Sequence, residues 1–178
     1  MKKIAYFFEF ILIKILFTLF QIMGYRLSSN LGFFIGRTIG PIFRSKKMII
    51  QNLEKANIQH SNLSKIASNV LGNYGRIFAE YNYLKKFRNN ELKKYVSIDG
   101  LEHLENLKKQ NKKAVFISGH FNNFELMAME IEKAGIDLAA IYRPLNNIFL
   151  NKTMEKIRKE YICKNQIKKG RAGSREII

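Results

Sequence analysis

The chain has 178 residues, 47% of them hydrophobic and 25% charged, and its 31 Lys and Arg against 14 Asp and Glu give a formal net charge of +17. The apolar fraction excludes a disordered polymer, the 11 Gly and 2 Pro exclude a fibrous chain, and the length allows one domain with a core of its own. One cysteine, Cys163, excludes an internal disulfide framework, and one cysteine with three histidines is too few for a structural zinc site.

The positive charge has two interpretations. It attracts polyanions such as nucleic acid, an anionic membrane surface or an acidic partner. The sequence is also rich in Lys, Asn and Ile, the residues that AT-rich codons supply, so genome composition explains the charge equally well. The charge alone therefore does not identify a partner.

The first apolar segment, residues 4–23, predicts a membrane anchor that is either spanning or half-embedded. It has the length of about 20 residues that crosses a hydrocarbon core, although Glu9 and Lys14 interrupt it. A buried core helix is the alternative, and a cleaved signal peptide fits poorly because no small-residue cleavage site follows. We expect residues 1–24 to form the anchor and residues 25–178 the remaining domain. The basic residues that follow favour a cytoplasmic location for that domain: Arg26, Arg37, Arg44, Lys46 and Lys47.

Three helical patterns follow the anchor. Residues 31–42 hold three glycines and a proline and predict a broken or short helix packed near the membrane. Residues 45–56 predict a polar, basic helix. Residues 63–87 carry apolar side chains three and four positions apart, which predicts a long amphipathic helix.

The second half of the chain alternates short apolar runs with helical patterns. The runs predict strands at residues 95–98, 114–118 and 137–142, the second of them buried on both faces. The helical patterns lie at residues 101–110, 123–134 and 147–161. This alternation predicts a βαβαβ core with a mostly parallel sheet. The fold class that we expect is α/β with a helical N-terminal portion.

The turn after the second predicted strand is the candidate active site. Ligands of open parallel sheets bind beyond the carboxyl ends of the strands, and His120 lies at this edge after the flexible Gly119. If His120 is in the turn and Glu125 in the first helical turn, the carboxylate can reach the imidazole. Such a pair predicts a general base that deprotonates a hydroxyl. The alternative is a turn histidine followed by a carboxylate that the helix macrodipole favours.

Two longer strings surround this pair. SGHFNNFEL occupies residues 118–126, and IYRPLNN occupies residues 141–147. Together they resemble the H-F-x-N-[WF]-E and Y-R-P-x-x-N strings of the lipid A biosynthesis acyltransferase family, the late lauroyl and myristoyl transferases of lipopolysaccharide assembly. An apolar N-terminal helix, an Asn-Leu pair at residues 52–53 and the NYGR…E pattern of residues 73–80 extend the resemblance over nearly the whole chain.

The resemblance implies an acyl transfer. His120 would activate a hydroxyl of an acyl chain already carried by the glucosamine disaccharide of a lipid A precursor, Glu125 would orient His120, and the thioester of an acyl carrier protein would be the donor. It also implies a fold of the glycerolipid-acyltransferase type and a bacterial inner-membrane location with the catalytic part on the cytoplasmic side. We expect no cofactor, because the sequence has no dinucleotide-binding, P-loop or metalloprotease motif, and no metal, because acyl transfer from a thioester needs none. We expect no nucleic-acid partner, because no aromatic-flanked basic motif appears.

Four more residues are candidates for substrate binding: Arg143, Arg158, Asn122 and Asn123. Arg143 belongs to the YRP string, and Arg158 stands where the family carries a further arginine. Each has a plainer interpretation, namely a strand-end salt bridge for Arg143, a solvated basic face for Arg158 and a helix cap for the two asparagines. Tyr142 and Pro144 are expected to shape the turn rather than to touch the substrate.

Members of the resembled family extend further, with another half of the sheet and an acidic D-Q motif downstream. Residues 170–178 resemble the lead-in to the next family helix, so we expect residues 25–178 to be the N-terminal part of an incomplete acyltransferase domain. Three alternatives stay open: a non-catalytic basic protein of membrane surfaces, an inactive fragment, and an acyltransferase that acts on another glycolipid or on a phospholipid.

Overall fold

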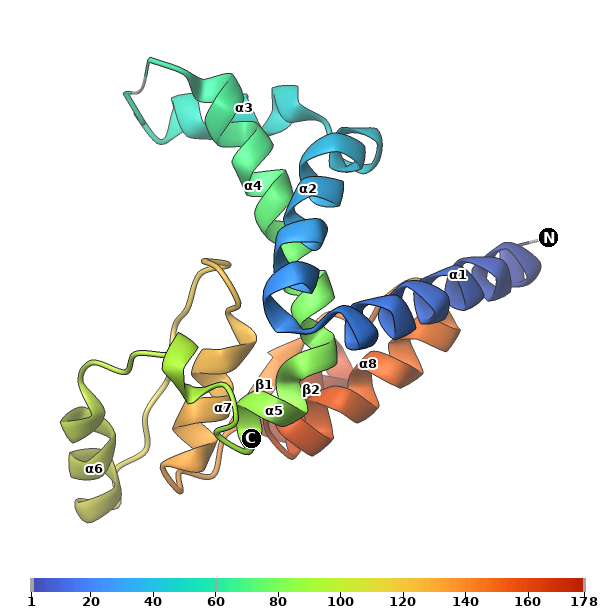
Figure 1. The fold of residues 1–178 in the computed structure, drawn as a ribbon. Coiled ribbons are helices and arrows are strands. Elements are labelled where there is room, and N and C mark those ends of the chain that lie inside the picture. The colour runs from blue at the N-terminus through green and yellow to red at the C-terminus, as the bar shows by residue number, and fades with distance from the viewer. Residues whose placement is uncertain (1, 60, 178) are drawn as a thin grey trace. The chain divides into compact units, whose positions relative to one another are not determined.

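In the computed structural model, which describes residues 2–59 and 61–177, the chain is mostly helical and contains a short parallel sheet (Figure 1). It divides into two compact units. The first unit joins the chain up to Ile15 with the chain from Leu84 onwards, and the second unit is Leu16–Tyr83. The fold class is therefore α/β, with helices predominating.

The N-terminal segment forms one helix, α1, Lys2–Met23, as the sequence predicts. Among the described residues, α1 is the helix that is long and apolar enough to cross a membrane. Only 11% of its most apolar window is buried in the protein. A core helix would be mostly buried, so this exposure is compatible with a membrane association of α1.

The second unit is built on two helices, α2 (Tyr25–Phe43) and α4 (Leu63–Glu80), with the shorter α3 (Lys46–Lys55) and the 3₁₀ turn η1 (Tyr81–Tyr83). The predicted break within residues 31–42 is wrong, because α2 is continuous there. Its proline, Pro41, lies in the last turn of the helix. The buried apolar side chains of this unit include Phe17, Phe20, Ile49, Ala67, Leu71, Ile77 and Tyr83.

The glycines of α2 allow it to pack closely on α4 and do not interrupt the helix. A Cβ atom on Gly32 would lie 2.6 Å from the carbonyl oxygen of Gly75, and a Cβ atom on Gly36 would lie 2.9 Å from the Cα atom of Gly75. Side chains at these positions would hold the two backbones apart. The sequence pattern therefore marks a close contact between α2 and α4, which two helices achieve only with glycine at the crossing.

A buried carboxylate joins the same two helices. Glu80 is 5% exposed and accepts hydrogen bonds from Ser29 Oγ at 2.8 Å and from the Tyr25 hydroxyl at 3.2 Å. Burial of a carboxylate is costly unless donors surround it, and α2 supplies both of these hydroxyls. Glu80 thus ends α4 in a polar contact with the first turns of α2.

The first unit holds the sheet. Strand β1 (Ala139–Tyr142) pairs in parallel with β2 (Asn165–Lys168), with Ala139 opposite Asn165 and Tyr142 opposite Lys168, and α8 (Ile148–Tyr161) connects them. The strand predicted at residues 137–142 is confirmed by β1, whereas β2 was not expected because its sequence, NQIK, is mostly polar. The other elements of the unit are α5 (Leu84–Arg88), η2 (Lys93–Tyr95), α6 (Leu101–Lys109), α7 (Glu125–Lys133) and α9 (Arg171–Ile177).

Two predicted strands are wrong. Residues 96–98 and 114–118 are extended but form no strand in the described chain, and residue 95 ends η2. Val115 and Ile117 are 90% and 92% exposed, although the sequence predicts that they are buried on both faces. A strand exists only where a neighbour supplies hydrogen-bond partners, and an apolar run does not tell whether that neighbour is present. The βαβαβ core is therefore reduced to the one βαβ unit of β1, α8 and β2.

The predicted helices of this half are confirmed. Residues 101–110 correspond to α6, residues 123–134 to α7 and residues 147–161 to α8, with ends that differ by one or two residues. The expected helix at residues 63–87 is interrupted by η1 and continues as α5. Residues 170–178 contain α9, and Ile178 lies outside the described residues.

The glycine contact gives a first testable prediction. Gly75→Ala adds a methyl group against the Gly32 carbonyl, so we expect the free energy of unfolding of the second unit to fall by about 1–3 kcal/mol, measured by denaturant titration. Asn69→Ala, on an exposed position of α4, is the control and should leave the stability equal or slightly higher. Equal stability of the Gly75 variant and the parent would show that the backbones do not pack this closely.

Candidate active site

The segment that carries His120 enters α7 through a tight turn. Residues 112–121 are extended, and Asn122 has φ 43°, in the left-handed region that Asn tolerates better than most residues. The exposed imidazole of His120 packs on the ring of Phe124, with 4.4 Å between the ring centroids. Asn123, half-buried, follows in the same turn. The segment therefore presents His120 to solvent, against the ring of the residue that precedes α7.

That first residue is Glu125, and it is held by α8. Glu125 is 7% exposed, and its Oε1 atom accepts hydrogen bonds from Arg158 Nε at 2.9 Å and Arg158 Nη2 at 2.7 Å. The arginine is itself largely buried, with 18% of its side chain exposed. Two charge-assisted bonds at these distances fix the carboxylate, because an unpaired charge in this position would be strongly unfavourable.

The same arginine contacts the end of the sheet. Its guanidinium lies 5.7 Å from the centre of the Tyr142 ring, within the range of a cation–π interaction, and Tyr142 is the last residue of β1. Burial, and next the carboxylate of Glu155, raise the pKa of the Tyr142 hydroxyl above its usual value, so the phenol is neutral near pH 7. Glu125, Arg158 and Tyr142 therefore form one cluster that joins α7, α8 and β1, called the Glu125 cluster below.

The next residue of the YRP string, Arg143, lies in a different environment. Arg143 follows Tyr142 directly beyond the carboxyl end of β1 and is exposed. Parallel strands place ligand-binding residues at this edge, and a mobile exposed guanidinium there suits a phosphate or a carboxylate. The structure thus divides the two arginines of the motif region: Arg158 is built into the Glu125 cluster, and Arg143 faces solvent.

Comparison with known proteins bears on these residues. A family model described as bacterial lipid A biosynthesis acyltransferase matches residues 1–168. The chain belongs to this family. Searches of the curated proteins and of the solved structures gave no match. The match spans both motif strings, so the resemblance drawn from them is confirmed and the chain is an acyltransferase of lipid A biosynthesis.

Sequence reasoning brought His120 and Glu125 together and placed Arg158 with the substrate. In the structure of this acyltransferase the observed partner of Glu125 is Arg158, and the observed neighbour of His120 is Phe124. The His120–Glu125 pair and the substrate contacts of Arg143, Arg158, Asn122 and Asn123 stay predictions. No group of three or more His, Cys, Asp or Glu suited to a metal ion occurs within residues 2–59 and 61–177.

One residue of the motif region has a larger part than the sequence suggested. Asn147, 6% exposed, caps α8: its Oδ1 accepts from the backbone N–H groups of Phe149 at 3.1 Å and Leu150 at 3.2 Å. Its Nδ2 donates to the Tyr6 carbonyl at 2.8 Å and to Glu9 Oε2 at 3.0 Å, both on α1. The signal was present in the sequence, since Asn before a helical pattern is a common N-cap, but its contacts with α1 were not predictable.

A second ion pair supports α7 near its other end. Arg88 Nη1, on α5, lies 2.5 Å from Glu132 Oε2, and Glu132 Oε1 accepts a hydrogen bond from the Lys164 backbone N–H at 3.1 Å. α7 is therefore fixed at its first turn by Arg158 and in its last turn by Arg88. These two contacts set the position of the helix that follows His120.

The Arg158 contact gives the second prediction. Arg158→Gln leaves the Glu125 carboxylate buried without its guanidinium, so we expect the free energy of unfolding of the first unit to fall by about 3 kcal/mol. Lys159→Gln on the same helix removes only an exposed pair with Glu155 and should change it by less than about 1 kcal/mol. The measurement is denaturant unfolding followed by circular dichroism.

A double variant separates charge from packing. Glu125→Gln with Arg158→Gln removes both charges, so it should be less destabilised than the sum of the two single variants. If the single effects add, the two side chains do not interact as the structure places them.

Proposed function

We propose that this acyltransferase transfers a fatty acyl group from the thioester of an acyl carrier protein to a hydroxyl of a lipid A precursor, with His120 as the general base. The observation that carries the proposal is the placement of His120: it is exposed, in the segment that leads into α7, five positions before a carboxylate that Arg158 holds in place. The family supplies the reaction class, acyl transfer in lipid A biosynthesis.

The proposed reaction needs one base. The imidazole of His120 takes the proton of the acceptor hydroxyl, and the oxygen attacks the thioester carbonyl carbon, which gives a tetrahedral oxyanion. Collapse of this intermediate breaks the carbon–sulfur bond. The thiolate of the carrier then takes the proton from the imidazolium, so the products are the new ester and the free carrier thiol. Acyl transfer from a thioester requires no redox cofactor.

Glu125 is the proposed positioning residue for His120. A carboxylate beside an imidazole selects its tautomer and stabilises the imidazolium that forms when the hydroxyl is deprotonated. Arg158 and Tyr142 support this role because they fix the carboxylate at the start of α7.

Arg143, with Asn122 and Asn123, is the proposed contact of the substrate. A lipid A precursor is an anionic phosphorylated glycolipid, and an exposed guanidinium at the carboxyl end of β1 suits a phosphate. Amide side chains in the turn before α7 suit sugar hydroxyls. The net charge of +17 also favours association with an acidic carrier protein and with the anionic inner membrane, on whose cytoplasmic side we place the reaction.

The third prediction tests the base. His120→Ala should lower acyl transfer from acyl carrier protein to a lipid A precursor by about 10²–10⁴-fold, because that is the usual contribution of general base catalysis. His103→Ala is the matched control, since this histidine is also exposed but lies on α6, and it should keep the parent rate. The assay follows radiolabelled acyl chains into the glycolipid.

Two outcomes would contradict the proposal. Full turnover by the His120 variant would remove its role as the base. No transfer by the parent chain, with undiminished binding to anionic vesicles, would instead favour a basic membrane-surface protein or an inactive fragment.

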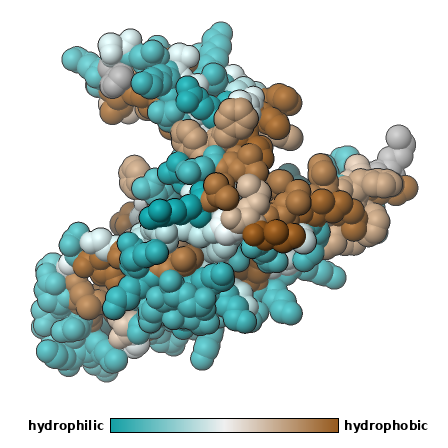
Figure 2. Space-filling view, viewed as in Figure 1, coloured by the Kyte–Doolittle hydropathy of each residue, from teal (hydrophilic) through white to brown (hydrophobic). Residues whose placement is uncertain are grey.

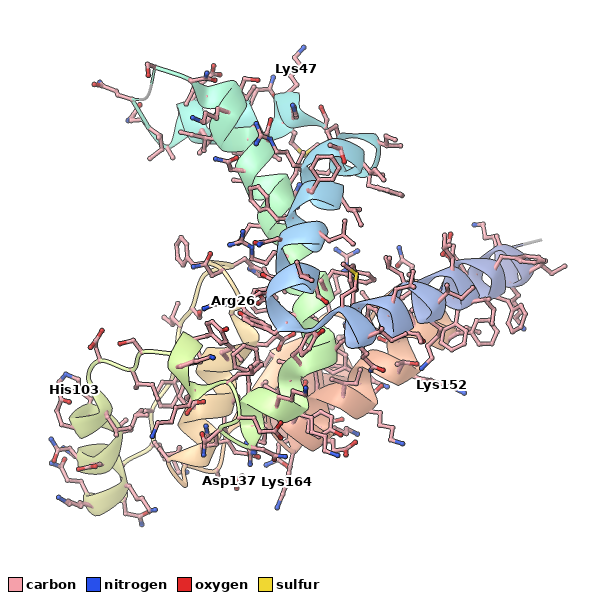
Figure 3. The ribbon with its side chains drawn as sticks, viewed as in Figure 1. Arg26, Lys47, His103, Asp137, Lys152 and Lys164 are labelled. Carbon is pink, nitrogen blue, oxygen red and sulfur yellow. The ribbon has the colours of Figure 1, made fainter. Side chains whose placement is uncertain are left out.

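The fourth prediction concerns Arg143. Arg143→Ala should raise the KM for the phosphorylated acceptor about tenfold and change kcat less, because an exposed guanidinium contributes to binding in the ground state as well as in the transition state. Lys164→Ala removes an equally exposed positive charge elsewhere in the first unit and should leave KM unchanged (Figure 3). Equal effects of the two variants would indicate general charge attraction rather than a specific contact.

A further inference from the structure

The exposed apolar side chains of α1 in the first unit lie on one side of the helix. They are 40% to 68% exposed: Ile4, Phe7, Phe8, Ile11, Leu12 and Ile15. Since a helix turns by about 100° per residue, these six positions fall within an arc of about 140°. Figure 2 shows apolar side chains gathered along this helix. The arc, called the α1 stripe below, is a continuous apolar surface that no part of the first unit covers fully.

The opposite side of α1 contacts α8. The Tyr6 carbonyl and the Glu9 carboxylate accept hydrogen bonds from Asn147, and the ring of Phe10 lies 5.9 Å from the ring of Phe149. Tyr6, Glu9 and Phe10 lie on the side of the helix that faces away from the centre of the α1 stripe. The first half of α1 therefore has two different faces, one on protein and one exposed.

The charges of α1 avoid the α1 stripe. Lys2, Lys3, Glu9 and Lys14 all fall outside its arc when placed on a helix of 3.6 residues per turn. Lys3 and Lys14 lie nearest to one edge of the arc, where long lysine side chains reach headgroups while their stems stay on apolar surface. Basic side chains beside an apolar face complement an anionic lipid surface.

The second half of α1, which belongs to the second unit, shows the same division within that unit. Phe17 and Phe20 are buried, at 6% and 1% exposed, whereas Leu19 and Ile22 are 50% and 78% exposed. The ring of Phe17 packs on Phe78 with 4.9 Å between centroids. Within the second unit, too, this half of α1 has both buried and exposed apolar side chains.

This division conflicts with a helix that crosses the bilayer alone. A single spanning helix meets lipid around its whole circumference, and its protein-bound face would carry Asn147 and the start of α8 into the hydrocarbon. Lys152 is exposed within the second turn of α8 (Figure 3). Charged side chains and polar helices are strongly disfavoured there.

We propose that α1 lies in the plane of the membrane interface, with the α1 stripe in the acyl-chain boundary of an anionic bilayer and the opposite face bound to α8. The α1–α8 contact is then part of the enzyme rather than a detachable anchor. It places the helix that carries Arg158 at the membrane surface. The proposal concerns how the chain meets the membrane, and it does not depend on the catalytic roles proposed for His120 and Glu125.

The test is a nitroxide scan of the full chain on vesicles of phosphatidylethanolamine with a minority of phosphatidylglycerol. Single cysteines replace four residues of the α1 stripe, Ile4, Phe8, Ile11 and Ile15, in a Cys163→Ala background. Cys163 is buried, and burial raises the pKa of its thiol, so the native thiol reacts slowly with the label. The same single cysteines in a chain that keeps Cys163 therefore provide a second set of variants. Ile13→Cys, on the side of α1 away from the α1 stripe, is the matched control position.

If α1 lies in the plane of the interface, the four stripe positions should have similar, shallow immersion depths. The ratio of accessibility to oxygen over accessibility to a water-soluble relaxant should be severalfold lower at position 13 than at the stripe positions. A spanning helix predicts a depth that rises to a maximum near position 11 and falls again towards both ends, and that result would overturn the proposal.

A second readout keeps the test independent of depth calibration. A membrane-impermeant maleimide should label Lys3→Cys from the same side of the membrane as Lys152→Cys. Binding of the protein to vesicles should also weaken severalfold when phosphatidylglycerol is left out. Labelling of position 3 only from the opposite side would establish a spanning helix. Either result leaves the acyl-transfer assay unaffected, so failure here is distinguishable from failure of the proposed reaction.

Discussion

The contact between Arg158 and Glu125 is the interaction on which the candidate site depends. It joins the start of α7 to α8 across 33 positions of sequence, with nitrogen–oxygen distances of 2.7 and 2.9 Å to one carboxylate oxygen. A largely buried ion pair of this kind adds little net stability compared with an apolar pair, but removal of one partner is costly. The pair therefore fixes position: it determines where α7 begins and so where the turn of His120 lies.

The rest of the first unit reinforces this position. Tyr142 ends β1 against the same guanidinium, and Arg88 holds Glu132 in the last turn of α7. As a result, the βαβ unit and α7 share one polar network, whereas His120 and Arg143 on either side of it are exposed. The polar network therefore supports the elements on which both exposed residues lie.

One residue of the motif region links α8 to the apolar N-terminal helix. Asn147 belongs to the IYRPLNN string, caps the helix that carries Arg158 and also donates hydrogen bonds to α1. An apolar N-terminal helix is usually interpreted as a tether, which can be exchanged without consequence for the domain. Here the first half of α1 contacts α8 through the hydrogen bonds of Asn147 and the packing of Phe10 on Phe149, so substitutions on this face of α1 are expected to disturb α8 as well.

The sequence by itself determined the family, the α/β class, the helices from α3 to α8 and the residues of the two motif strings, because helical periodicity and local motifs are written in neighbouring residues. It did not determine that residues 114–118 stay exposed, that glycines 32 and 36 pack on Gly75 within an unbroken helix, or that Glu125 meets Arg158. Each of these depends on a partner distant in the chain. An apolar run is buried only if a neighbouring strand exists, a glycine marks a break or a contact according to what faces it, and a carboxylate pairs with whichever cation the fold brings within reach.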